Sequence, residues 1–264
     1  MSKEYTSLGL MSGTSGDGID ASIIKSDGDT NYEVVTNKYF EYDHEIYQNI
    51  HDLKEKINNL KDLEKFADSL NDLERRITVF HAKVIKDLST DKKIDIVGFH
   101  GQTIYHNFEE KISMQLGNGN LLKQLTNKKI VYDFRSNDIL NGGQGAPLTP
   151  VFHHLISSQH NIKLPICFLN IGGISNITII KDRNELSRLI SKDIGPGNCL
   201  IDSWVRKNSN KKFDKNGNIS KAGKIDQLIT NQIIENFNID TYSKSLDIKD
   251  FDNSFARGLT FENG

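Results

Sequence analysis

Two stretches of the chain share one pattern, in which a short apolar run enters a glycine-rich turn and a second apolar run leaves it. The first spans residues 8–24 and has the tip Ser12-Gly-Thr-Ser-Gly-Asp-Gly18. The second spans residues 166–180 and turns at Gly172-Gly173. Apolar runs on both sides of such turns predict β-hairpins. One hairpin near the start of each half suggests a duplicated, two-lobed architecture, although hairpin pairs also arise by chance in mixed α/β proteins.

A long helical region separates the two hairpins. From Ile46 to Val84 the apolar residues recur every three or four positions, which is the spacing of one apolar helix face. We expect one helix, or two with a break near Asn58-Asn59. The run is long enough for a coiled coil. Its spacing drifts, however, and a strand at 94–98 follows directly, so helices packed on a sheet are the favoured interpretation.

Shorter elements complete the pattern. We expect a hairpin-like stretch to about residue 116, a helix at 119–126, a strand at 129–134, a helix from Pro147 to about 158, a helix from Asn198, and helical patterning over 224–237. Strands that alternate with helices indicate the α/β fold class. We place a first lobe at residues 1–160 and a second at 161–264.

Composition excludes several classes of protein. Lys and Arg number 33 against 35 Asp and Glu, for a net charge of −2, whereas nucleic-acid or anionic-membrane binding requires a strong basic excess. Apolar runs fall short of the roughly 18 residues that a membrane helix needs, and the first residues lack a signal peptide's apolar core. Cys167 and Cys199 form neither a disulfide framework nor a metal knuckle. We therefore expect a soluble, cytoplasmic protein that binds neither nucleic acid nor a membrane.

The tip of the first hairpin is suited to an anion. Its glycines let backbone N–H groups converge on a phosphate, and Thr14 and Ser15 add hydroxyl donors. Asp17 is suited to hold a hydrated Mg²⁺ through its outer shell. The string is neither a Walker A loop nor a Rossmann fingerprint. A plain hairpin turn explains it equally well.

The tip of the second hairpin, Asn170-Ile-Gly-Gly-Ile-Ser-Asn176, has the same ingredients. Two glycine loops that grip the phosphates of one nucleotide would suit phosphoryl transfer. A simple Gly-Gly turn remains the alternative.

Asp193 precedes the rigid turn Gly195-Pro-Gly197. A carboxylate held in this way can act as a general base toward water or a sugar hydroxyl. On spacing alone, an N-cap or an Asx-turn is the commoner use of Asp beside Gly and Pro.

Polar groups that suit a sugar occur in two further segments. Residues 99–106 follow the predicted strand 94–98, at the end where α/β proteins place ligands, and His100 and Gln102 can hydrogen-bond a polyol. His100 and His106 are too far apart in sequence, without a third ligand nearby, to indicate a metal site.

Arg135 presents a planar fork that suits a carboxylate. A structural ion pair with Asp133 or Asp138 is an equal alternative. The chain contains no Gly-x-Ser-x-Gly elbow, and neither cysteine has a His/Asn context, so catalysis by a serine or cysteine nucleophile is unsupported.

Six strings together resemble the 1,6-anhydro-N-acetylmuramic acid kinases. They are GLMSGTSGDGID (9–20), FHGQT (99–103), DFRSNDILNGGQGAPLTPVFH (133–153), LNIGGISNIT (169–178), DIGPGNCLID (193–202) and KSLDIKDF (244–251). They run in order over essentially the whole chain, and the Gly-Gly-Gln-Gly-Ala-Pro block is hard to obtain by chance.

The resemblance implies a fold of the actin, sugar-kinase and heat-shock ATPase superfamily, with two ribonuclease H-like lobes around an ATP cleft. It implies that ATP and Mg²⁺ are used to phosphorylate O6 of 1,6-anhydro-N-acetylmuramic acid while water opens the anhydro bond. The products are N-acetylmuramic acid 6-phosphate and ADP, in peptidoglycan recycling. A homodimer is expected by family analogy.

The resemblance also implies roles for individual residues. Asp193 is the base that activates water. The sugar-site residues are His100, Gln102, Arg135 and Asp138, and Arg135 suits the lactyl carboxylate. The ATP-binding residues are Gly13, Thr14, Ser15, Gly16, Asp17, Gly18, Ile19, Asp20, Gly172 and Gly173. No direct metal ligand is implied, and Asp17 remains the candidate for the outer shell of Mg²⁺.

Three departures from the family pattern stand out. Gly16 replaces a usual Leu, which predicts a looser turn, and Ile194 replaces a usual Thr after the base. Family members usually continue for roughly a hundred residues more, enough for a second lobe of ordinary size. We therefore expect a fragment or truncated product with an incomplete second lobe. The alternatives are an inactive remnant of such a kinase and another sugar kinase of the superfamily.

Overall fold

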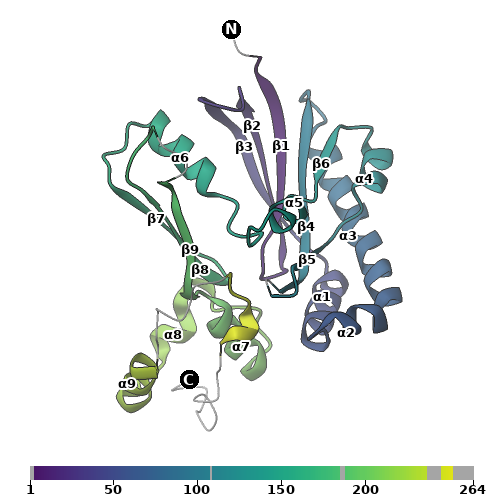
Figure 1. Cartoon of the computed structure of the whole chain (residues 1–264). Coiled ribbons are helices and arrows are strands. Elements are labelled where there is room, and N and C mark those ends of the chain that lie inside the picture. Colours follow the sequence, from purple (N-terminus) through teal and green to yellow (C-terminus); the bar gives the residue numbers. More distant parts are fainter. Residues whose placement is uncertain (1–2, 108, 185–187, 237–244, 252–264) are drawn as a thin grey trace. The chain divides into compact units, whose positions relative to one another are not determined.

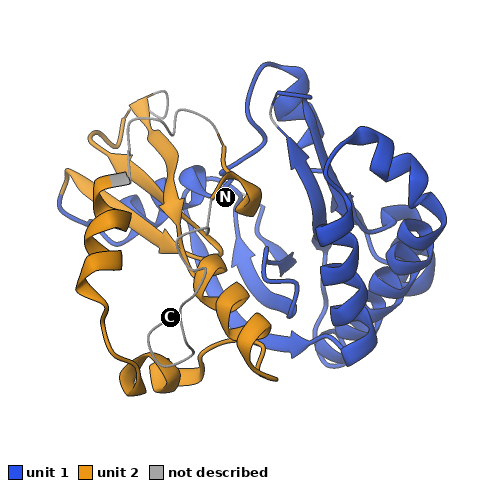
Figure 2. Ribbon diagram, turned by 90° about the horizontal axis from the view of Figure 1, so that it is seen from below, with its two compact units in different colours: residues 1–163 blue, residues 164–264 orange. Residues whose placement is uncertain are grey.

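The computed structural model describes residues 3–107, 109–184, 188–236 and 245–251 (Figure 1). The chain forms two compact units, residues 1–163 (unit 1) and 164–264 (unit 2), coloured separately in Figure 2. The predicted α/β class is confirmed. The end of the helix expected at 224–237 and Lys244 of the last motif lie outside the described residues.

Unit 1 is built on one sheet. Its strands are β1 (Tyr5–Ser12), β2 (Gly18–Ser26), β3 (Tyr32–Glu41), β4 (Ile96–Asn107), β5 (Ile112–Leu116) and β6 (Ile130–Tyr132). The order is β3-β2-β1-β4-β5, and β6 also pairs with β4. β1 and β2 form the antiparallel hairpin that the sequence predicts, and β1 runs parallel to β4. The glycine-rich tip of the hairpin therefore lies beside the middle of β4.

The long apolar run becomes three helices rather than two. The helices of unit 1 are α1 (His44–Lys56), α2 (Leu60–Lys65), α3 (Ala67–Leu88), α4 (Gly119–Thr126), α5 (Ser136–Leu140) and α6 (Pro150–Gln159). The predicted break is confirmed, because Asn59 caps α2 by accepting from the backbone N–H groups of Lys61 and Asp62. A second break, at Phe66, was not predicted.

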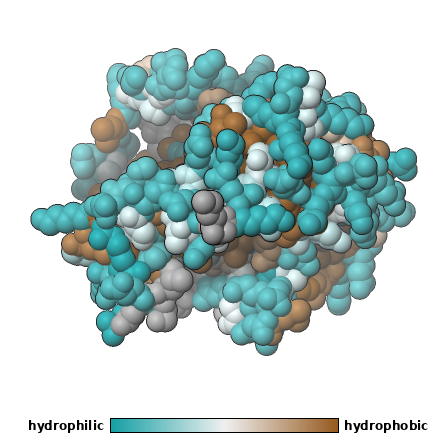
Figure 3. Space-filling model, turned by 90° about the horizontal axis from the view of Figure 1, so that it is seen from above, coloured by the Kyte–Doolittle hydropathy of each residue, from teal (hydrophilic) through white to brown (hydrophobic). Residues whose placement is uncertain are grey.

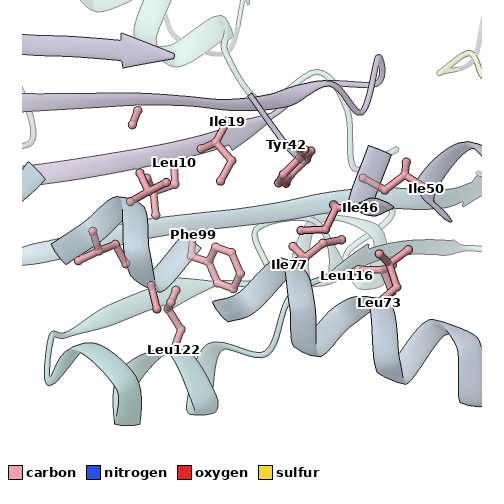
Figure 4. Close-up of a cluster of buried hydrophobic side chains, with 14 of the residues drawn as sticks. Leu10, Ile19, Tyr42, Ile46, Ile50, Leu73, Ile77, Phe99, Leu116 and Leu122 are labelled. Atoms are coloured by element: carbon pink, nitrogen blue, oxygen red, sulfur yellow. The ribbon is translucent and has the colours of Figure 1, made fainter. Parts of the chain in front are cut away.

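The apolar faces of α1 and α3 form the core of unit 1 together with the sheet (Figure 4). Ile50, Leu73 and Ile77 are fully buried, as the three-to-four spacing requires. Phe99 of β4 and Leu122 of α4 lie in the same cluster. Each such side chain contributes about 1.5–3 kcal/mol through burial. The helices therefore pack on a sheet, as predicted, rather than on each other as a coiled coil.

Strand β4 is longer than the strand expected at residues 94–98. β4 continues to Asn107 instead of ending at Gly98, because its second half pairs with β5 from Gln102 to Asn107. Residues 99–106 therefore lie within a strand and not after its end. The hairpin-like stretch expected up to about residue 116 is confirmed, because the second half of β4 and β5 form it. A bulge in the β1–β4 pairing near Gln102 accommodates the glycine at 101.

The edge strand β3 is covered at its first residue. The side chain of Gln159, at the end of α6, accepts from the backbone N–H of Tyr32 at 2.9 Å and donates to its carbonyl oxygen at 2.9 Å. An amide side chain thus forms the two bonds that a neighbouring strand would form.

Unit 2 contains an antiparallel sheet of β7 (Ile166–Ile171), β8 (Ile174–Ile180) and β9 (Ile190–Pro196), in that order. β7 and β8 are the second predicted hairpin. The described helices that follow are α7 (Cys199–Asn208), α8 (Asn218–Ala222) and α9 (Gln227–Asn236), with short 3₁₀ turns at 215–217 and 248–250. The helix expected from Asn198 is therefore confirmed as α7.

The molecular face in Figure 3 is mostly hydrophilic, with separate groups of apolar residues among polar ones. Among the helices of the described residues, none combines the length and the apolar character needed to cross a bilayer.

Candidate active site

Two side chains donate hydrogen bonds to the backbone of the tip between β1 and β2. Nζ of Lys54, on α1, donates to the carbonyl oxygen of Thr14 at 2.7 Å. Nε2 of Gln102, on β4, donates to the carbonyl oxygen of Gly13 at 2.9 Å. In a trans peptide the N–H points opposite to the carbonyl oxygen. The N–H groups of Thr14 and Ser15, which share peptide units with these carbonyl groups, therefore point away from Gln102 and Lys54 respectively.

Gly16 closes this tip in a conformation that suits glycine. Its N–H donates to the carbonyl oxygen of Gly13 at 3.2 Å, and its φ is +64°. A Cβ at Gly16 would lie 2.8 Å from Cγ2 of Ile50, which is fully buried. The tip therefore packs closely on α1 at the position where the family usually has Leu.

Acidic groups gather beside the tip. Oγ of Ser15 donates to Oδ1 of Asp17 at 2.5 Å. Partial burial and then the charge of Asp17 raise the pKa of Asp20. Burial, followed by the charge of Asp17 and a hydrogen bond to it, also raises the pKa of Tyr39. Asp17, Asp20 and the phenol of Tyr39 therefore lie close together beside the tip.

The other predicted ATP-binding residues of unit 1 lie in β2. Gly18, Ile19 and Asp20 pair with β3. Because the side chain of Ile19 is fully buried in the core, only its backbone is suited to contact a ligand.

Arg135 and His100 form one polar assembly. Nε and Nη2 of Arg135 lie 3.1 and 2.8 Å from Nε2 of His100, and Nη1 donates to the carbonyl oxygen of Gly145 at 2.5 Å. Nδ1 of His100 lies 2.7 Å from the carbonyl oxygen of Gly101. Burial and then the positive charge of Arg135 lower the pKa of His100 to about 4. A neutral His100 with its proton on Nδ1 satisfies all these contacts.

Asp138 organises the glycine block that follows it. Its Oδ2 accepts from the N–H of Gly145 at 2.7 Å, and its carbonyl oxygen accepts from the N–H of Gly143 at 2.8 Å. Asp133 instead accepts from Oγ of Ser136 at 2.5 Å. Arg135 and Asp138 thus meet at Gly145, and both stabilise the Gly-Gly-Gln-Gly-Ala-Pro block.

Gln102 lies under the first hairpin tip rather than at a surface. It is fully buried, and its Oε1 has no hydrogen-bond partner among the described residues. The contact between its Nε2 and Gly13 connects β4 to the tip. Gln102 therefore supports the hairpin tip, whereas His100 on the same strand contacts Arg135.

The second glycine tip is bound to the turn after Asp193. The N–H of Gly197 donates to the carbonyl oxygen of Gly173 at 2.9 Å, and the N–H of Asn198 donates to that of Gly172 at 2.7 Å. A Cβ at Gly197 would lie 2.1 Å from the Gly172 oxygen, so this contact requires glycine. The two motifs of unit 2 thus form one backbone assembly.

Asp193 lies within β9, opposite Asn176 of β8. It is buried, and its Oδ2 accepts from the N–H of Leu246 at 2.8 Å and from Oγ of Ser245 at 3.4 Å. The N-cap and Asx-turn interpretation is therefore wrong, since the backbone is a strand and these partners come from a distant segment. These contacts hold the carboxylate of Asp193 against the segment at 245–246.

The match to known proteins agrees with these features. The model of a family described as "Anhydro-N-acetylmuramic acid kinase" matches residues 5–255.

The chain belongs to the anhydro-N-acetylmuramic acid kinase family.

Individual relatives support this assignment. The anhydro-N-acetylmuramic acid kinase of Pelagibacter ubique (strain HTCC1062) is 57% identical over 268 residues, which cover 100% of this chain and 71% of the relative. Proteins of the same name from Agrobacterium fabrum and Brucella abortus (strain 2308) are 38% and 35% identical, over 95% and 92% of this chain and 69% and 67% of their own lengths. The predicted family is confirmed, and the chain is a phosphotransferase of the kinase class.

Sequence reasoning missed two sets of residues in this anhydro-N-acetylmuramic acid kinase family member. Lys54 had no local motif to mark it, because it lies on a polar position of an amphipathic helix. Ser245 and Leu246 belong to a string that carried the resemblance, but nothing in that string indicated a contact with Asp193. Only the folded chain brings residues 52 or more positions apart together.

Proposed function

We propose that this chain uses ATP to phosphorylate O6 of 1,6-anhydro-N-acetylmuramic acid while water opens the anhydro bond. The products are N-acetylmuramic acid 6-phosphate and ADP, in peptidoglycan recycling. The observation that carries the proposal is the held tip of the first hairpin, where Lys54 and Gln102 fix two carbonyl oxygens and direct the opposite N–H groups outward. The names of the relatives supply the substrate.

ATP phosphates would bind at the tip, to the N–H groups of Thr14 and Ser15 and to their hydroxyls. Gly172 and Gly173 of unit 2 are the second candidate phosphate loop. Asp17 fits an outer-shell position for Mg²⁺, with Asp20 beside it. When bound, Mg²⁺ neutralises charge on the transferring phosphoryl group.

Asp193 would remove a proton from a water molecule, and the water oxygen would attack the anomeric carbon. The bond from that carbon to O6 then breaks, and O6 leaves with the electron pair. O6 attacks the γ-phosphorus of ATP, the bond from that phosphorus to the bridging oxygen breaks, and ADP leaves. Asp193 later returns its proton to solvent. A general base of this kind contributes about 10²–10⁴ in rate.

Arg135 would bind the lactyl carboxylate of the sugar. Its contacts with His100 and Gly145 fix the plane of the guanidinium, and a planar fork binds a carboxylate more strongly when its orientation is set in advance. His100 bonds to Arg135, and Asp138 bonds to the glycine block. We therefore propose that these two residues act on the sugar mainly through those partners.

The finer architecture belongs to the same proposal. We assign the lobes at 1–160 and 161–264 to a duplicated, actin-like fold, and we propose a cytoplasmic location and a homodimer by analogy with the family.

A coupled assay of ADP release tests the function. With ATP, Mg²⁺ and 1,6-anhydro-N-acetylmuramic acid, we expect ADP formation that depends on the sugar. Asp193→Asn should lower kcat by at least about 10²-fold while ATP binding, followed by calorimetry, stays largely intact. Sugar-dependent release that survives in Asp193→Asn would remove the base assignment. ATP binding without any sugar-dependent release in the unmodified chain would remove the activity.

A further inference from the structure

We infer that Ser245 and Leu246 form a positioning clamp for Asp193, which sets the orientation of the carboxylate that the proposed function uses as its base. The catalytic part of this inference rests on the proposed function. The contact itself does not.

Both donors of the clamp reach one oxygen. The N–H of Leu246 lies 2.8 Å from Oδ2 of Asp193, and Oγ of Ser245 lies 3.4 Å from the same atom. All three residues are buried, with 6–7% of their surface exposed. Hydrogen bonds to a carboxylate are stronger than neutral ones, and burial strengthens them further. Of these two contacts the backbone bond is the stronger, because it is the shorter, at 2.8 Å against 3.4 Å.

Strand pairing and the clamp fix different parts of Asp193. The register of β8 and β9 sets the backbone of Asp193 opposite Asn176. It leaves the rotation of the carboxylate about its own axis undefined, because that torsion is broad. Two donors on Oδ2 remove this freedom and so define the direction of Oδ1. A base must be aligned with the proton that it removes, so this orientation bears directly on kcat.

The segment after the clamp is internally ordered. Oδ1 of Asp247 accepts from the N–H of Lys249 at 3.0 Å, and the N–H of Asp247 donates to Oδ2 of Asp250 at 2.7 Å. This reciprocal capping box fixes the backbone immediately after Leu246. The clamp donor is therefore presented by a segment with defined geometry, which gives the string KSLDIKDF a role.

Serine variants test the catalytic consequence. Ser245→Ala should lower kcat about threefold to tenfold, the size expected for one hydrogen bond, and should leave KM for ATP unchanged. Loss of a donor makes a carboxylate easier to protonate, so the acidic limb of the kcat profile should move to higher pH. Ser245→Thr, which keeps the hydroxyl, should restore both values.

Ser191→Ala is the matched control. Ser191 lies on β9 two residues before Asp193, and its hydroxyl donates to the carbonyl oxygen of Ile177 at 3.1 Å. The kcat and the pH profile of Ser191→Ala should be the same as those of the unmodified chain. Equal effects of Ser245→Ala and Ser191→Ala, or a kcat loss in Ser245→Ala without a shift of the acidic limb, would overturn the catalytic role of the clamp.

Amide hydrogen exchange at Leu246 tests the contact without any turnover. Exchange should be slowest in the unmodified chain, several-fold faster in Asp193→Asn, where a neutral amide replaces the carboxylate, and fastest in Asp193→Ala. Asp182→Asn, in an exposed turn of unit 2, should leave it unchanged. Equal exchange in the unmodified chain and Asp193→Asn would overturn the clamp. Protection that depends on Asp193 in a chain without ADP release would remove the proposed function and keep the clamp.

Discussion

Two nitrogens of the Arg135 guanidinium, Nε and Nη2, bond to the single acceptor Nε2 of His100, at 3.1 and 2.8 Å. The arrangement requires a neutral imidazole, and burial together with the nearby guanidinium favours that neutral form. An uncharged imidazole thus helps to orient the cationic side chain of Arg135. This is the property that a binding site for a carboxylate requires.

Arg135→Ala should raise KM for 1,6-anhydro-N-acetylmuramic acid about tenfold or more, because a charge-assisted contact of about 1.5–3 kcal/mol is lost. KM for ATP should change little. Steady-state kinetics with the sugar and with an analogue lacking the lactyl group separate the roles. Arg76→Ala, which breaks ion pairs with Glu45 and Asp72, is the control. Equal loss with both sugars would exclude the carboxylate contact.

Acid should destabilise unit 1 through two histidines. Burial lowers the pKa of His81 to about 4, and burial together with Arg135 lowers the pKa of His100 to about 4. The ordinary pKa of histidine is near 6.5. Between about pH 4 and pH 6.5 the unfolded chain therefore binds more protons than the folded chain. The contribution of each histidine to stability is therefore complete above about pH 6.5 and is lost as the pH falls toward 4, by up to about 1.4 kcal/mol per pH unit.

Urea unfolding at pH 7 and pH 5 measures this loss. His81→Leu should reduce the difference between the two pH values by about 1–2 kcal/mol, since a buried apolar side chain does not titrate. His44→Gln, at an exposed position of α1, should leave the difference as it is. An identical difference in His81→Leu would contradict the assignment.

Gln102→Met should weaken ATP binding. It removes the donor to Gly13 and keeps the volume of a fully buried side chain, so the first hairpin tip loses one of its two supports. We expect KM for ATP to rise several-fold, with KM for the sugar nearly unchanged. Gln115→Met, on the neighbouring strand β5, is the control. A rise confined to KM for the sugar would instead favour the direct sugar contact that the sequence predicted.

Gly16→Ala should destabilise the chain more than Gly28→Ala. Both glycines have positive φ, +64° and +81°, but a Cβ at Gly28 would meet nothing within 4 Å, whereas one at Gly16 would lie 2.8 Å from Ile50. Backbone strain alone costs about 1–2 kcal/mol, and overpacking adds about 1–3 kcal/mol. Urea unfolding of both variants isolates the packing contribution. Equal losses would mean that the tip relaxes away from Ile50.

Local patterns predicted the parts of the fold that depend on local chemistry. The hairpins at 8–24 and 166–180, the break at Asn59 and helix α7 follow from turn residues, caps and apolar spacing. β9 was missed because its Gly-Pro-Gly end resembles a loop. The hairpin up to about residue 116 was expected, but not that its first strand continues β4 without a break at Gly98.

The site could be predicted only as a set of separate motifs. Glycine-rich tips and Asp193 were visible because they are unusual strings. The contacts of Gln102 with Gly13, of His100 with Arg135 and of Leu246 with Asp193 join residues that are 35 or more positions apart. Such contacts depend on strand register and chain crossing, which no local pattern contains.

The glutamine at the end of α6 has a consequence for how this protein behaves at high concentration. An open strand edge can template the strand of another molecule and begin aggregation. Gln159 occupies the backbone groups of Tyr32 where β3 begins, and the charged side chains of Glu33, Lys38 and Glu41 lie along the same strand. A molecule that adds a strand from the beginning of β3 would have to displace this side chain first, so pairing at that end of the outermost strand is opposed.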